Sequence, residues 1–111
     1  MSRLAGALII PDAKIVRYLL DATHPIGRFK ADFFGAFGFR QDRAHVFAAA
    51  LLKHADDHPI HGERAHGHGI NRVVRGPLES PDRRDPVVDV IWFQATGSTT
   101  HRLITVYPAL R

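Results

Sequence analysis

Cysteine is absent from this chain of 111 residues, which has only one methionine and one tryptophan. Without cysteine there is no disulfide framework, no thiolate nucleophile and no cysteine-ligated zinc, which excludes many small secreted and metal-binding domains. The sequence also lacks any run of about 18 uncharged apolar residues that could cross a bilayer. The apolar run within residues 1–10 is too short for the core of a secretory signal. We therefore expect a cytoplasmic protein in a reducing compartment, without membrane contact.

A strong excess of charge of one sign is missing as well. The chain carries 15 Lys and Arg against 11 Asp and Glu, a net charge of +4 that is spread evenly and forms no polybasic tail. This distribution favours an ordinary solvated surface over a general nucleic-acid face, although its sign suits a phosphate-bearing partner. With 45% hydrophobic residues the chain is too apolar to be disordered. Length and composition predict one globular domain over residues 1–111.

The first part of the chain, residues 1–57, has apolar residues at helical spacing. Asp12 and Asp42 are placed to cap helices, and Gly38 is placed to end one. The predicted helices run from residue 12 to 21, from 28 to 37 and from 42 to 57.

The second part has the pattern of an antiparallel sheet. Residues 58–69 are rich in His and Gly without periodicity, which predicts an exposed connection. Strands are predicted at Ile70–Arg75, Val87–Gln94 and Arg102–Tyr107, within a sheet region spanning 70–108. Turn residues between them favour consecutive antiparallel pairing. The fold class is therefore α+β, with the N-terminal helices packed on one face of a three- or four-stranded antiparallel meander.

Alternation along the last strand decides which polar side chains remain free. If Ile104 and Val106 face the helices, then His101, Thr105 and Tyr107 line the open face. Arg72 or Arg75 from the first predicted strand can join them there. The alternative, equally weighted, is that Thr105 and Tyr107 are ordinary strand-forming residues.

The segment from His24 to Lys30 carries the most informative polar residues. Arg28 and Lys30 fall in the first turn of a predicted helix, where the helix dipole disfavours cations. A phosphate bound by the free N–H groups of that turn would compensate, and His24 could act as a general base. The alternatives are that the two cations swing into water and that His24 is a turn residue.

The His-rich segment also raises the possibility of a metal. His58, His61, His66 and His68 offer enough ligands for zinc or nickel. Their glycine-rich context would require a large ordering cost, so we expect no metal site. The sequence has no His-Glu-x-x-His, Gly-x-Ser-x-Gly or phosphate-binding P-loop motif, which removes the usual support for protease, hydrolase and NTPase activities.

Three blocks of the chain resemble a known family. They are Ile10-Pro-Asp-Ala-Lys14 with Tyr18-Leu-Leu, then His24-Pro-Ile-Gly-Arg-Phe-Lys-Ala31 with Phe34, and finally Val90-Ile-Trp92 with Arg102-Leu-Ile-Thr-Val-Tyr-Pro108. With them the chain resembles a family of short, uncharacterised bacterial toxin-like domains. Members occur beside small antitoxin-like partners or as C-terminal modules of polymorphic toxins, so the resemblance implies an antitoxin-like protein partner. The order of helices then strands is similar, at the level of fold, to the RelE, barnase and colicin RNase toxin group.

That resemblance implies RNA as the substrate and a metal-independent endoribonuclease as the activity, with no cofactor. Such cleavage needs a base for the 2′-hydroxyl, cations for the developing charge and a donor for the leaving oxygen. The expected catalytic residues are His24 or His101 as the proton acceptor, together with Tyr107. The expected substrate-binding residues are Arg28, Lys30, Arg72, Arg75, Trp92, Arg102 and Thr105.

Three alternatives remain at this stage, and one is an enzyme that acts on a nucleotide or a protein side chain with the same cations. Trp92 lies on an apolar strand, where a core position is more typical than stacking on a base. The whole domain could also be a non-catalytic module that binds nucleic acid or protein with the same cations.

Overall fold

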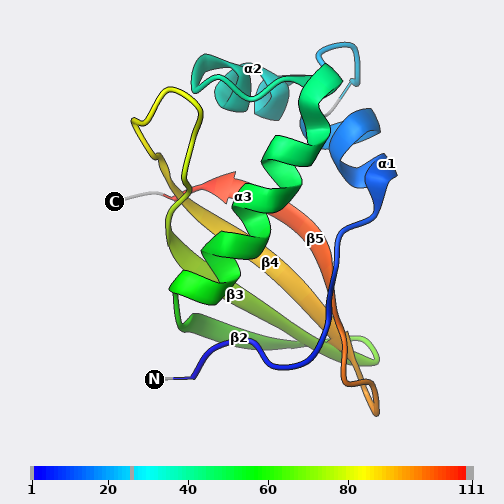
Figure 1. The fold of residues 1–111 in the computed structure, drawn as a ribbon. Coiled ribbons are helices and arrows are strands. Elements are labelled where there is room, and N and C mark those ends of the chain that lie inside the picture. The colour runs from blue at the N-terminus through cyan, green and yellow to red at the C-terminus, as the bar shows by residue number, and fades with distance from the viewer. Residues whose placement is uncertain (1, 26, 110–111) are drawn as a thin grey trace.

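The computed structural model describes residues 2–25 and 27–109. Helical segments come first and most of the sheet follows (Figure 1). The helical elements are α1 (Asp12–Lys14), the π-helix η1 (Ile15–Leu19), α2 (Arg28–Ala36), the 3₁₀-helix η2 (Gln41–Arg43) and α3 (Ala44–Asp57). The strands are β1 (Leu8–Ile9), β2 (Ile60–His66), β3 (Gly69–Pro77), β4 (Val87–Ala95) and β5 (His101–Pro108).

The first predicted helix is present but irregular. One α-turn leads into η1, where Leu20 N donates to Ile15 O at 2.9 Å, a spacing of five residues. Ile15, Leu19 and Leu20, at the two ends of this wider turn, are all buried in the core. Asp12 stands in the first turn and makes no cap hydrogen bond.

The other two helices are close to prediction, with one difference at a cap. After α2, Gly38 adopts φ +97° and Phe39 N donates to Phe34 O at 3.2 Å, so the predicted glycine stop is confirmed. Asp42 does not cap α3, because its carboxylate binds the Arg40 guanidinium at 2.8 and 2.9 Å instead.

The sheet has five strands in the order β1-β5-β4-β3-β2. Strands β2 to β5 form the predicted antiparallel meander, and β1 adds a parallel pairing with the start of β5 that sequence reasoning missed. The expected exposed connection over 58–69 is wrong, because Ile60–His66 pairs with β3 through a tight turn at Gly67, where φ is +57°. Its side chains are mostly exposed, which explains why no alternation was visible.

One hydrophobic core joins the helices to one face of the sheet (Figure 1). Phe34 and Phe47 from the helices meet Val90, Trp92 and Leu103 from the strands, and all five are fully buried. The α+β class is therefore confirmed. Within the part of the chain that the structure describes, no helix is long and apolar enough to span a membrane.

A β-bulge in β5 changes which residues face this core. Ile91 pairs with Thr105 but Trp92 pairs with Leu103, so Ile104 is the extra residue. Leu103 and Val106 are both buried against the helices, whereas Ile104 turns to the opposite, uncovered face. Of the two residues expected on the helix side, Val106 lies there and Ile104 does not, because simple alternation does not anticipate a bulge.

Candidate functional site

The loop before α2 is shaped by one close approach between two backbone segments. Gly27 N donates to His24 Nδ1 at 2.9 Å, and the imidazole lies edge-on to the Tyr18 ring with 5.2 Å between ring centroids. A Cβ at Gly27 would stand 2.1 Å from the Tyr18 carbonyl oxygen, so no larger residue fits. The loop thereby fixes His24 against Tyr18 and starts α2 at Arg28.

Lys30 connects this loop to the far end of the chain. Its Nζ donates to Thr105 Oγ1 at 2.5 Å and lies 3.9 Å from the centroid of the Tyr107 ring. The same ammonium lies 5.4 Å from the centroid of the Tyr18 ring. Two ring faces near one cation are favourable for a charge that has left bulk water. Four residues expected at the site, His24, Lys30, Thr105 and Tyr107, therefore share one neighbourhood.

A second lysine makes this neighbourhood strongly positive. Lys14 Nζ lies 5.5 Å from the centroid of the Tyr18 ring, which Lys30 also approaches. Neither ammonium forms an ion pair with a carboxylate of the described residues. Burial lowers the pKa of Lys30, and repulsion from Lys14 lowers it further. We call Lys14, Tyr18, His24, Lys30, Thr105 and Tyr107 the Lys30 cluster. It offers an anion two ammonium groups that form no ion pair with a carboxylate of the described residues.

His101 and Arg72 form a separate cluster on the helix-covered face. His101 Nδ1 lies 2.9 Å from Ala5 O, and Arg72 Nη1 lies 2.8 Å from His101 Nε2. Arg72 also donates to Gln94 Oε1, and its Nε lies 3.6 Å from Glu63 Oε1. Burial, more than the nearby guanidinium, lowers the pKa of His101. The imidazole is therefore neutral and spends both nitrogens on structural contacts, so the expected grouping of His101 and Arg72 with Thr105 and Tyr107 is wrong.

The remaining expected residues are placed differently from one another. Arg75 forms a two-point ion pair with Asp89 at 2.6 and 2.8 Å, which neutralises it. Trp92 is fully buried, so its ring has no face for a base and belongs to the core. Arg102 is exposed on β5, and Arg28 lies over the Phe29 ring at 4.9 Å, with Phe29 65% exposed.

The histidines of the chain differ from the candidate metal ligands in where they lie. Among the described residues, no three His, Asp or Glu side chains gather in a way that could hold a metal ion. A second buried histidine, besides His101, is His54 on α3, whose Nε2 lies 3.1 Å from Gly76 O. Burial lowers its pKa to about 4. Its place on the apolar stripe with Phe47 and Leu51 was the available signal, because that spacing puts it on the core side of α3.

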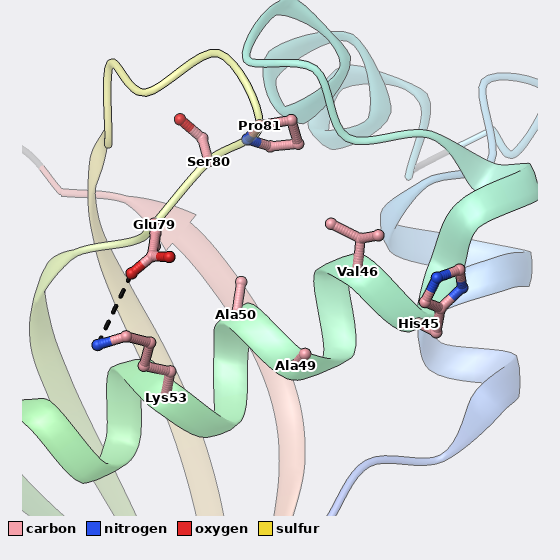
Figure 2. A pocket seen from close by; sticks show the side chains of 8 residues that line it. All are labelled: His45, Val46, Ala49, Ala50, Lys53, Glu79, Ser80 and Pro81. Carbon is pink, nitrogen blue, oxygen red and sulfur yellow. Dashed lines mark ion pairs between the residues drawn. The ribbon is translucent and has the colours of Figure 1, made fainter.

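Two hollows in the surface differ in the residues that line them. A groove of about 370 Å³ runs between α3 and the β3–β4 loop, with Val46, Ala49 and Ala50 along it (Figure 2). Lys53 and Glu79 lie at one end of the groove, 3.7 Å apart, and none of the expected site residues lines it. The other hollow, of about 280 Å³, lies on the uncovered face of the sheet between His66, Asn71, Phe93 and Ile104.

Comparison with known proteins finds a similar fold and a family to which the sequence belongs. The chain superposes with a TM-score of 0.70 on a chain of a contact-dependent growth inhibition toxin–immunity protein complex from Klebsiella pneumoniae 342. The match covers 91% of this chain and 99% of the other at 18% sequence identity, which establishes similarity of fold. No protein of curated function gives a significant sequence match. The family model "Domain of unknown function (DUF6883)" matches residues 4–110, and the chain therefore belongs to the DUF6883 family.

Proposed function

We propose that this chain is a toxin-like domain that cleaves RNA without a metal, using the Lys30 cluster. The observation that carries the proposal is the meeting of Lys30 with Thr105 and Tyr107, 75 residues away along the chain in the case of Thr105. Together with His24, which lies against Tyr18, they bring an amine, two hydroxyl groups and an imidazole around a positively charged position. That set suits phosphate ester chemistry, in which negative charge develops on the phosphate oxygens.

We assign the role of proton acceptor to Lys30 and not to His24. His24 Nδ1 accepts the Gly27 N–H, so this nitrogen is already used as an acceptor. A lowered pKa increases the fraction of Lys30 in the neutral form that can accept a proton. Lys14 supplies further positive charge beside Lys30.

The proposed step transfers the 2′-hydroxyl proton to Lys30 Nζ as the 2′-oxygen attacks phosphorus. The bond between phosphorus and the 5′-oxygen breaks, and Tyr107 gives its hydroxyl proton to that oxygen. The products are a 2′,3′-cyclic phosphate and a 5′-hydroxyl. Return of a proton from Lys30 to Tyr107 restores the starting state. Thr105 acts by positioning the amine.

A toxin role and a small inhibitory protein partner are supported by the fold. The similar chain comes from a complex of a contact-dependent growth inhibition toxin with its immunity protein. A positively charged nuclease site also needs a protein that blocks it in the producing cell. We extend both features to this chain as part of the proposal.

The test is incubation of the purified protein with total bacterial RNA in excess EDTA. We expect fragments with 2′,3′-cyclic phosphate ends and a loss of rate of about 10²–10⁴-fold in Lys30→Met. Lys30→Arg keeps the positive charge but cannot accept a proton, so it should be as inactive as Lys30→Met. Lys53→Met removes an exposed lysine on α3 and serves as the matched control, with unchanged cleavage.

Two outcomes would contradict the proposal at different levels. If Lys30→Arg keeps most of the activity, Lys30 holds the phosphate and another group is the base. If the folded wild-type protein yields no fragments but still binds RNA, the domain is a non-catalytic binding module.

A further inference from the structure

The face of the sheet turned away from the helices has a surface of its own. Cross-strand pairing places Asn71, Phe93 and Arg102 in one row across β3, β4 and β5. Val73, Ile91 and Thr105 form the next row. Successive rows are about 7 Å apart along a strand. Because Thr105 binds Lys30, the hollow beside Phe93 lies on the same face as the Lys30 cluster, one row away.

Phe93 is placed like a stacking platform in this hollow. Its ring is partly exposed and packs over Gly69, where a Cβ would come within 2.6 Å of the ring. The His66 ring meets Phe93 at 90° with 6.4 Å between centroids and forms one wall. Ile104, pushed to this face by the β-bulge, forms another. An aromatic face bounded by a second ring and an aliphatic wall suits a flat, unpaired base.

Asn71 supplies a polar group beside this ring. Its side-chain oxygen is buried and has no hydrogen-bond partner among the described residues. An unsatisfied acceptor of this kind is costly. Asn71 lines the hollow, and its Cβ–Cγ torsion is soft enough for rotation to present the amide there. A side-chain amide pairs at two points with a base edge that has an amino group next to an acceptor ring nitrogen. Adenine presents this pattern on two edges and cytosine on one, so adenine fits best.

Positive charge flanks the hollow on both sides. Arg64 lies opposite Asn71 on β2, and Arg102 lies opposite Phe93 on β5. Both are exposed, and neither forms an ion pair with a carboxylate within the described part of the chain. In contrast, Arg75 on the same face is occupied by Asp89. The two free guanidinium groups are available to the phosphates on either side of a bound base.

We infer that the hollow formed by His66, Asn71, Phe93 and Ile104 binds an unpaired adenine base of the RNA whose backbone passes the Lys30 cluster. The base stacks on Phe93, and the Asn71 amide reads its edge. This inference rests on the proposed function for the identity of the ligand as RNA. It adds a subsite that selects the base near the cleaved bond.

Binding of an uncleavable probe tests the subsite independently of catalysis. We would titrate ¹⁵N-labelled protein with short 2′-O-methyl oligoadenylate, which has no 2′-hydroxyl to react, and follow the Asn71 side-chain amide signals. We expect those signals to shift, oligouridylate to bind more weakly, and Phe93→Leu to weaken oligoadenylate binding about tenfold. Asn71→Leu should abolish the preference for adenylate, while Leu52→Ala on the helix side should change nothing.

The outcomes separate this inference from the proposed function. Binding of oligoadenylate that survives in Lys30→Met, while cleavage is lost, supports both. Binding at Asn71 by a wild-type protein that does not cleave RNA supports the subsite and rejects the nuclease. Unshifted Asn71 signals at about 1 mM oligoadenylate overturn the subsite, because even non-specific binding is tighter than this. Shifts of the same signals by a protein partner alone would assign the hollow to that partner instead.

Discussion

The two faces of the sheet treat their polar side chains in opposite ways. On the helix-covered face, Arg72 and His101 satisfy each other and hold the N-terminal segment through Ala5. On the uncovered face, Lys30 contacts Thr105 and Tyr107. It forms no ion pair with a carboxylate of the described residues. Sequence patterns alone group these side chains together. The difference shows that a polar residue is available for chemistry when the fold leaves its charge without a partner, rather than when its residue type is suitable.

The largest expected effect is a loss of stability at low pH caused by His54, which is buried on the covered side of the sheet. Its folded-state pKa of about 4 lies below the ordinary 6.5, so as the pH falls from 6.5 to 4 the unfolded chain takes up a proton that the folded chain does not. Stability contributed by the neutral ring is therefore complete above pH 6.5 and is lost as the pH falls toward 4. A pKa difference of about 2.5 corresponds to about 3 kcal/mol of unfolding free energy.

Urea denaturation at several pH values measures this contribution. In His54→Asn, the fall in stability over that pH range should be smaller by about 3 kcal/mol than in the wild type. His45→Asn, an exposed histidine on the same helix, is the matched control and should leave the profile unchanged. An identical slope in His54→Asn and wild type would mean that the buried ring is not what makes the protein acid-sensitive.

The next effect concerns the loop that builds the uncovered-face site. Gly27→Ala puts a methyl group 2.1 Å from the Tyr18 carbonyl oxygen, so the loop or η1 must move. We expect a cost of about 2 kcal/mol and a loss of RNA cleavage in the protein that remains folded, because His24 and Lys30 lose their positions. Gly35→Ala on α2, where nothing lies within 4 Å of the new Cβ, should be harmless. Full activity in Gly27→Ala would show that this loop is not needed for the site.

A change in the cluster of Arg72 and His101 on the covered face should lower stability and leave cleavage unchanged. Arg72→Met leaves the buried His101 Nε2 and the Gln94 amide oxygen without their donor. We expect a loss of about 1–2 kcal/mol in unfolding free energy, with the cleavage rate of the folded protein unchanged. Denaturation and a cleavage assay on the same sample separate the two. A loss of cleavage without a loss of stability would return Arg72 to the substrate site.

Particular residues show how far the sequence reaches. The apolar spacing around Phe34 and Phe47 predicted two helices, and the valine-rich runs predicted three strands, because core burial imposes those periods. The β2 strand was not predicted, because its exposed edge imposes no alternation. The bulge at Ile104 was not predicted, because one inserted residue reverses every later side chain. For the site, the motif containing His24 and Lys30 was informative. The hydrogen-bond partners of His101, and the residues that line the hollow with Asn71, come from distant strands and a terminal segment that no local pattern connects.

The smallest expected effect concerns Lys30 itself and separates stability from function. A lysine whose folded-state pKa is lowered opposes folding below its ordinary pKa of 10.5, since the folded protein binds the proton less tightly than the unfolded chain. Lys30→Met should therefore raise the unfolding free energy slightly at pH 7, by a fraction of 1 kcal/mol once solvent screening is counted. The gain should shrink as the pH rises toward 10.5 and vanish above it, where the wild-type amine loses its charge in both states. Lys53→Met is the matched comparison, because its ammonium is paired with Asp57 and its pKa is raised, so its removal should lower stability at pH 7. A clear loss of stability in Lys30→Met would mean that this lysine serves the fold, and the contrast between the two faces of the sheet would no longer hold.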